Sequence, residues 1–150
     1  FAHTGPSLTA AIGVARSLLA AGGRLLLVTG AAGERDPGRR SAVGRAASAA
    51  EQIWIADEDP RGEDPNVIAA AIRDAAGELL GASASERITV LHDRRAAIAA
   101  AISTAAPGDV VLLAGKGHER TIERAGVDEP WDEAAAAREA LTSLGYPQGT

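Results

Sequence analysis

The chain has 150 residues, which is the size of one domain with room for a full hydrophobic core. Its formal net charge of −5 excludes binding to nucleic acid through the charge of the whole chain, because that mode requires a basic footprint. The sequence has no cysteine, so disulfides and thiolate chemistry are excluded, and no apolar run approaches the roughly 20 residues of a membrane span. It also has no methionine and begins at Phe1, which predicts that the chain is one domain of a longer polypeptide.

Helical and strand patterns alternate along the chain. Apolar residues at helical spacing end at Gly22-Gly23, and the next segment is a short, continuous apolar run that ends at Gly30. The alternation continues to the end of the chain, with Pro65 at a position that suits the first turn of a helix. The pattern predicts helices over residues 8–19, 38–50, 65–75, 94–104 and 132–144, strands over 24–30, 53–56, 88–91 and 110–115, and an irregular segment or short hairpin after Glu119.

The predicted strands are continuous apolar runs rather than alternating ones. That pattern is typical of strands whose two faces are both covered by helices, as they are in parallel sheets. The sequence therefore predicts a three-layer, Rossmann-like α/β domain in which a mostly parallel sheet is flanked by helices. Residues 1–150 contain no linker or repeat, and we expect them to form a single domain.

Polar and glycine residues follow each predicted strand, whereas the segments that precede the strands are ordinary turns. The polar segments are residues 30–40, 57–65, 92–94 and 115–120. In an open parallel sheet, ligands bind beyond the carboxyl ends of the strands, where we expect these four segments to meet. Since the segments contain both arginines and carboxylates, the sequence predicts a site for an anionic or zwitterionic ligand.

Common nucleotide and metal motifs do not account for these segments. The glycines at positions 30 and 33 lack the G-x-G-x-x-G spacing of a dinucleotide fingerprint, and 115–117 is not a Walker A loop because position 110 is not glycine. His3, His92 and His118 lack metal-ligand spacing, so no metal site is predicted. Lys116 is the only lysine in a chain whose other basic residues are all arginine, which indicates that a compact ammonium group is needed there.

Taken together, the loop segments resemble the C-terminal domain of the Mur ligases, in particular the MurE type, which adds the third amino acid of the peptidoglycan stem. The resemblance covers nearly the whole chain. It consists of Phe-Ala-His-Thr at 1–4, Gly-Glu-Arg-Asp-Pro-Gly-Arg-Arg at 33–40, Glu-Asp-Pro-Arg at 58–61, Glu-Asp-Pro at 63–65, Asp-Arg at 93–94 and Ala-Gly-Lys-Gly-His-Glu at 114–119. Each motif alone is modest, and their shared order and spacing carry the resemblance.

The resemblance implies an ATP-dependent amide ligase. ATP, with Mg²⁺, phosphorylates the terminal carboxylate of UDP-N-acetylmuramoyl-L-Ala-D-Glu, and the amino group of the incoming amino acid attacks the acyl phosphate. A central domain outside these residues binds most of the ATP and Mg²⁺, so the partners of this chain are that domain, an N-terminal domain and the two substrates. The resemblance places the enzyme in the bacterial cytoplasm and assigns no catalytic residue to this domain, which we expect to be inactive alone.

The resemblance also assigns binding roles to individual residues. Arg35 is expected to hold the carboxylate of the incoming amino acid, since a guanidinium can bind a carboxylate through two hydrogen bonds. Glu119 is expected to take an ammonium group, and His3 is expected near the ATP phosphates. The predicted substrate-binding residues are Arg35, Glu58, Asp59, Arg61, Gly115 and Glu119.

One position of the predicted specificity loop departs from the family pattern. Members that add meso-diaminopimelate have Asn where Asp59 stands. A carboxylate favours a bare distal ammonium over a head group that has its own carboxylate, so Asp59 predicts L-lysine or L-ornithine as the substrate. The retained Arg61 argues for meso-diaminopimelate unless Glu58 or Asp59 pairs with it.

Two other functions remain open at this point. A stand-alone Rossmann-like binding module predicts that no phosphate-loop domain precedes the chain. A different Mur-type ligase predicts a phosphate loop upstream but a different substrate loop at Glu58–Arg61.

Overall fold

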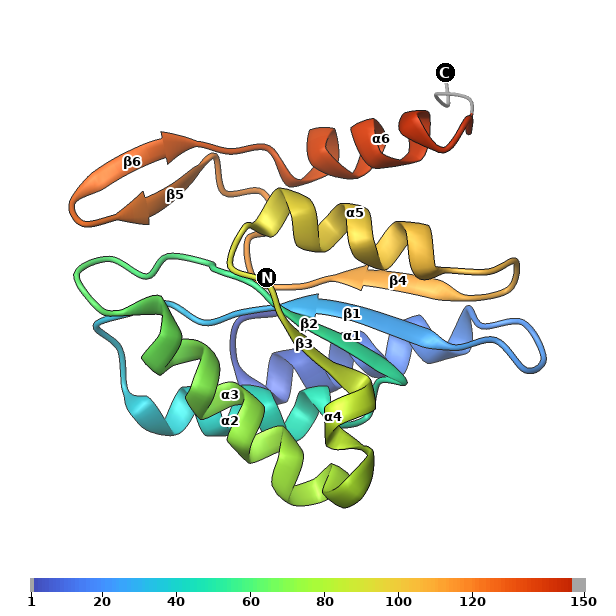
Figure 1. Cartoon of the computed structure of the whole chain (residues 1–150), viewed down its shortest axis with the longest axis horizontal. Helices are drawn as coiled ribbons and strands as arrows, with labels where there is room; N and C mark the ends of the chain where they lie inside the picture. The colour runs from blue at the N-terminus through green and yellow to red at the C-terminus, as the bar shows by residue number, and fades with distance from the viewer. Residues whose placement is uncertain (1, 147–150) are drawn as a thin grey trace.

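Four short strands form a parallel sheet in the order β3-β2-β1-β4 in the computed structural model, which describes residues 2–146 (Figure 1). In β1, one of the two inner strands of the sheet, Leu27 lies opposite Ile53 and Leu112. All of β1 is buried, which confirms the prediction from its continuous apolar run. The strands are β1 (Leu25–Thr29), β2 (Gln52–Ile55), β3 (Ile88–Val90) and β4 (Val110–Leu113).

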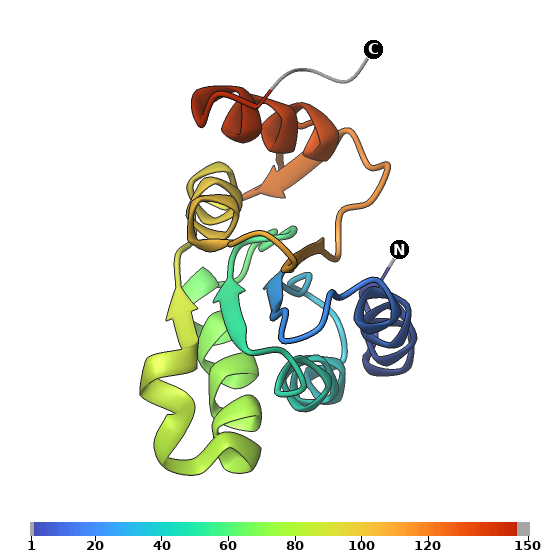
Figure 2. The same cartoon turned by 90° about the vertical axis from the view of Figure 1, so that its right-hand side faces the viewer.

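Three helices cover one face of the sheet and two cover the other (Figures 1 and 2). The first face packs against α1 (Gly5–Ser17), α2 (Pro37–Ala47) and α3 (Pro65–Leu80), and the second against α5 (Arg94–Thr104) and α6 (Glu133–Ser143). Successive residues of β1 enter different cores, because strand side chains alternate between faces. The predicted three-layer architecture is thereby confirmed. The first core includes Leu8, Ile12, Leu25, Leu27, Ile53 and Ile72, and the second includes Leu26, Val28, Trp54, Ile98 and Ala136.

Local capping explains where the structure departs from the predicted helix ends. Helix α1 begins at Gly5, earlier than the apolar periodicity indicated, because Thr4 and Ser7 form a reciprocal capping box. Helix α3 continues to Leu80, and a 3-10 turn (Gly81–Ser83) and a one-turn helix α4 (Ala84–Arg87) lead from it into β3. These two short elements contain no buried residues, so they lack the apolar pattern that would have predicted them.

The segment after Glu119 forms the short hairpin that was one of its two predicted forms. Strands β5 (Thr121–Arg124) and β6 (Val127–Pro130) pair antiparallel in a two-stranded sheet of their own. Ala125 and Gly126 both have positive φ angles of 48° and 78°, which is the backbone of a two-residue hairpin turn. None of the helices within residues 2–146 is long and apolar enough to cross a membrane.

Candidate functional site

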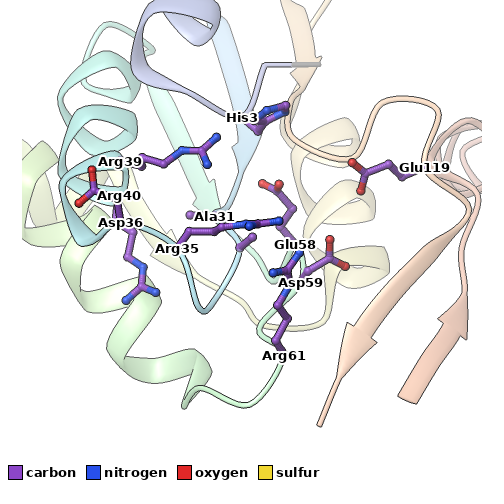
Figure 3. Close-up of a pocket in the computed structure, with 11 residues that line it drawn as sticks. His3, Ala31, Arg35, Asp36, Arg39, Arg40, Glu58, Asp59, Arg61 and Glu119 are labelled. Carbon is purple, nitrogen blue, oxygen red and sulfur yellow. The ribbon is translucent and has the colours of Figure 1, made fainter. Parts of the chain in front are cut away.

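The loops after β1, β2 and β4 meet at the carboxyl edge of the sheet around a pocket of about 140 Å³ (Figure 3). Five of the six predicted substrate-binding residues line it, and so does His3. The sixth, Gly115, lies against the pocket, because a Cβ atom there would be 2.7 Å from Oε2 of Glu58. Phe1, which opens the first motif of the resemblance, lies outside the described residues. The lining consists of His3, Ala31, Ala32, Arg35, Asp36, Arg39, Arg40, Glu58, Asp59, Arg61 and Glu119.

Backbone hydrogen bonds hold the predicted specificity loop, residues 58–61, between the β1 loop and the hairpin. The amide of Gly33 donates to the carbonyl of Asp59 at 2.7 Å. A Cβ atom on Gly33 would lie 2.0 Å from the carbonyl oxygen of Pro60, so this close approach requires glycine. Arg61 has a φ of 55°, its amide donates to the carbonyl of Glu123, and its carbonyl accepts from the amide of Ala125. The loop is therefore positioned from both sides by main-chain contacts.

Glu58 is the buried carboxylate of the pocket. It is 5% exposed, and its Oε2 atom has no hydrogen-bond partner within the described part of the chain. Burial raises the pKa of Glu58 from 4.5 to about 7, although the charges of Arg94 and Lys116 act in the opposite direction. Glu58 can therefore accept a hydrogen bond from a ligand, and a ligand cation would stabilise its charged form.

Asp59 is bound to Lys116, a partner that the expectation of L-lysine or L-ornithine as the substrate did not include. The Nζ atom of Lys116 lies 2.8 Å from Oδ1 of Asp59, and that oxygen also accepts from the amide of Glu123 at 2.8 Å. In this arrangement Asp59 is therefore a paired carboxylate, and the choice between L-lysine or L-ornithine and meso-diaminopimelate stays a prediction. Lys116 is also 2.6 Å from Oε2 of Glu119, so the carboxylate expected to take an ammonium already has a cationic partner.

Arg35 and Arg39 differ from Arg40, which belongs to the same motif, in whether an acidic side chain pairs with them. Arg40 is buried and binds both carboxylate oxygens of Glu63, at 2.8 and 2.7 Å. Within residues 2–146, no such partner is found for Arg35 or Arg39. In Figure 3, Arg35 extends across the pocket toward Glu58, and Arg39 points toward His3. The pocket thus has free guanidinium groups on one wall and a buried carboxylate on the other.

Arg39 was missed by the sequence reasoning. It belongs to the quoted motif at 33–40, but that motif gave a role only to Arg35. The available signal was its position in the first turn of α2, three residues after the capping residue Asp36, where side chains lie close to the carboxyl edge of the sheet.

The loop after β3 does not join the pocket, contrary to the expectation that all four polar segments would meet. Both ring nitrogens of His92 form hydrogen bonds: Nδ1 lies 2.8 Å from Oδ1 of Asp57, and Nε2 lies 3.1 Å from Oδ1 of Asn66. Arg94 is 1% exposed and binds Glu133 and the carbonyl of Ala114. These contacts connect α5 to β4 and α6, so the Asp-Arg motif at 93–94 has a structural role in this fold. Within residues 2–146, no group of three or more histidine or acidic side chains is arranged to hold a metal ion.

The fold and site define a class of protein: a parallel α/β domain with a pocket lined by charged side chains at the carboxyl edge of its sheet. The sequence profile described as "Mur ligase, glutamate ligase domain" matches residues 1–117, and the chain belongs to that family. The resemblance read from the loop motifs is thereby confirmed.

The chain is also similar to individual curated ligases and to a solved ligase structure. The chain is 43% identical over 146 residues to a UDP-N-acetylmuramoyl-L-alanyl-D-glutamate–2,6-diaminopimelate ligase of Chromobacterium violaceum, covering 97% of this chain and 28% of that protein. It is 42% identical over 147 residues to a UDP-N-acetylmuramyl-tripeptide synthetase of a Roseiflexus species, with the same coverage of 97% and 28%. A solved structure of a 2,6-diaminopimelate ligase superposes with a TM-score of 0.85 at 32% identity, covering 98% of this chain and 29% of that one. The chain therefore spans less than a third of the length of these relatives.

Proposed function

We propose that this chain is the C-terminal domain of a longer ATP-dependent amide ligase, which adds 2,6-diaminopimelate to UDP-N-acetylmuramoyl-L-alanyl-D-glutamate in the bacterial cytoplasm. Relatives more than 40% identical over 97% of the chain have names that state this reaction. The structural observation that carries the proposal is the bipolar pocket, in which unpaired Arg35 faces the buried carboxylate of Glu58. A zwitterionic amino acid matches that separation of charge.

In this proposal, Arg35 binds a carboxylate of the incoming amino acid through a charge-assisted hydrogen bond. Glu58 accepts from an ammonium group, which restores the hydrogen bond that its Oε2 atom lacks in the unliganded pocket. The side chain of Arg61 is 22% exposed, and its Nε atom forms a 3.4 Å ion pair with Oε2 of Glu123 but no hydrogen bond. Arg61 is therefore able to turn to a second carboxylate, which diaminopimelate has and lysine lacks.

ATP supplies the phosphoryl group that activates the terminal carboxylate of the nucleotide-linked substrate as an acyl phosphate. We assign the binding of ATP and Mg²⁺ mainly to the central domain of the longer protein, and we place His3 on the side of the pocket that faces the phosphates. This chain contributes amino-acid binding, orientation of the attacking amine and exclusion of water when it closes over that domain. Excluding water matters because an acyl phosphate is readily hydrolysed.

The test is an amide-ligation assay with the full-length protein, ATP, Mg²⁺ and UDP-N-acetylmuramoyl-L-alanyl-D-glutamate. The product mass is measured with meso-diaminopimelate, L-lysine and L-ornithine offered separately. We expect the highest kcat/KM with meso-diaminopimelate, and no ligation by the 150-residue chain alone. A clear preference for L-lysine or L-ornithine would contradict the substrate assignment, and ligation of a different acceptor or no ATP-dependent ligation would contradict the reaction.

The variant Arg61→Ala tests the same assignment from the protein side. The substitution removes the proposed partner of the distal carboxylate, so kcat/KM should fall for meso-diaminopimelate and change little for L-lysine. Arg73→Ala is the matched control, because Arg73 is an exposed arginine on α3 that pairs only with its neighbour Asp74. Equal losses with both amino acids would indicate that Arg61 does not bind the distal head.

A further inference from the structure

Lys116 is a buried cation whose position is fixed by an unusual loop. It lies after β4 between Gly115 and Gly117, whose φ angles are 113° and 54°. Residues with a Cβ atom rarely adopt these angles, so the course of the loop depends on glycine at both positions. The side chain of Lys116 is 1% exposed, although lysine is among the residues least often buried.

Two carboxylates of the pocket hold the ammonium group in place. Its Nζ atom is 2.8 Å from Oδ1 of Asp59 and 2.6 Å from Oε2 of Glu119. Asp59 is 57 positions away in the sequence, so this contact joins the specificity loop to the loop after β4. A buried ammonium group without carboxylate partners would destabilise the fold. The positions of Lys116, Asp59 and Glu119 therefore depend on one another.

The charge of Lys116 determines what the pocket presents to a ligand. With Lys116 in place, Asp59 has a cationic partner and a backbone donor, and Glu58 is the buried carboxylate without a hydrogen-bond partner at Oε2. Without Lys116, the same pocket would gain a net negative charge close to Arg61. Such a charge would repel a second carboxylate on a ligand and would favour a bare ammonium.

We propose that Lys116 is a positioning residue that sets substrate choice: by neutralising Asp59, it makes the pocket selective for an amino acid whose distal head carries both an ammonium and a carboxylate. This inference rests on the proposed function, because it assigns to Lys116 the discrimination between diaminopimelate and lysine. Lys116 acts through Asp59 and Glu119 and does not contact the reacting atoms.

The experiment measures the ratio of kcat/KM for meso-diaminopimelate to kcat/KM for L-lysine in the full-length ligase. Lys116→Met removes the cation, and we expect the ratio to fall by about tenfold or more. Adding Asp59→Asn to Lys116→Met removes the exposed negative charge, and we expect the ratio to return most of the way to the wild-type value. A merely structural role predicts equal losses for both amino acids and no return of the ratio in the double variant.

Arg120→Met is the matched control, because it removes a cation from the same loop without touching Asp59 or Glu119. Arg120 is 75% exposed and pairs with Asp132, and we expect its loss to leave the ratio unchanged. If Lys116→Met does not fold, as judged by thermal unfolding, Lys116→Gln takes its place, because glutamine removes the charge but can still donate hydrogen bonds to the two carboxylates. The same fall of the ratio and the same return with Asp59→Asn are expected, and a ratio equal to that of the wild type in Lys116→Gln would overturn the proposal.

These outcomes separate the inference from the proposed function. A wild-type enzyme that ligates neither amino acid refutes the proposed function. A wild-type enzyme that is active, with a ratio that does not change in Lys116→Met, refutes the role of Lys116 alone.

Discussion

Glu58 should make the stability of the chain fall as the pH rises, and Glu58→Gln should remove that dependence. Burial raises the pKa of Glu58 from 4.5 in the unfolded chain to about 7 in the fold. Below pH 4.5 the carboxyl is neutral in both states and has no electrostatic effect on folding. Between pH 4.5 and 7 the unfolded chain releases a proton that the folded chain keeps, so stability is lost as pH rises through 7.

The size of the effect follows from the two pKa values. Each pH unit between them corresponds to about 1.4 kcal/mol, so the ionised carboxylate lowers the free energy of unfolding by about 3 kcal/mol at pH 8. Glutamine has nearly the same shape and no charge. Relative to wild type, Glu58→Gln should therefore be more stable by about 3 kcal/mol at pH 8 and of similar stability at pH 4.

Urea unfolding of the 150-residue chain, followed by circular dichroism at intervals from pH 4 to 8, measures this difference directly. Other carboxylates also make stability depend on pH, but their contributions cancel when the variant is subtracted from the wild type at each pH. Glu78→Gln is the control, because it removes an exposed carboxylate on α3. If the stability difference between Glu58→Gln and wild type stays constant across this range, Glu58 is not a buried carboxyl whose neutral form the fold favours.

Three further predictions concern single positions. Arg35→Ala should raise the KM of the full-length ligase for the amino acid by about 10- to 150-fold, the equivalent of one charge-assisted hydrogen bond, in steady-state kinetics. Gly115→Ala should lower the free energy of unfolding by about 1–3 kcal/mol in urea unfolding, because a φ of 113° is strained for alanine. Gly13→Ala is the control and should not destabilise the chain, because Gly13 lies in a helix with open space around it. The hydrogen bond from Arg24 lowers the pKa of Asp109 to about 2, so the ionised form of Asp109 stabilises the fold above about pH 4. In acid unfolding, the wild type should be more stable than Asp109→Asn above this pH, and the difference in stability should disappear as the pH falls through about 2.

The architecture was predictable because its signals are local. A strand such as β1, with five consecutive buried residues of which four are apolar, can satisfy that pattern only in a sheet covered on both faces. The position of the site was predictable for the same reason, since parallel strands bring their carboxyl ends to one edge. Arg35 and Glu119 could be placed together in this way although they are far apart in the sequence.

The charge pairing within the site was not predictable, because it depends on contacts between distant loops. The sequence shows Asp59 as an acidic substitution in a specificity loop, and nothing near it indicates a partner. Its partner Lys116 comes from the loop after β4 and is fixed by the backbone of two glycines. The segment that contains Arg94 is similar: it was expected to meet the other polar segments at the site, whereas the buried ion pair of Arg94 with Glu133 gives it a structural role.

The pocket combines a buried carboxylate with an exposed guanidinium, and this combination is the strongest argument for binding. Within residues 2–146, Oε2 of Glu58 has no hydrogen-bond partner, which carries a cost in the unliganded fold, and the exposed Arg35 has no ion-pair partner and is open to a ligand. Nearby side chains show that the chain is able to pair charges at this edge, because Arg40 binds Glu63 and Lys116 binds Asp59. A zwitterionic ligand would supply the missing partners to Glu58 and Arg35 at once. An incoming ammonium group would offset the cost of ionising the buried Glu58 at neutral pH, which is how a binding site is expected to trade stability for affinity.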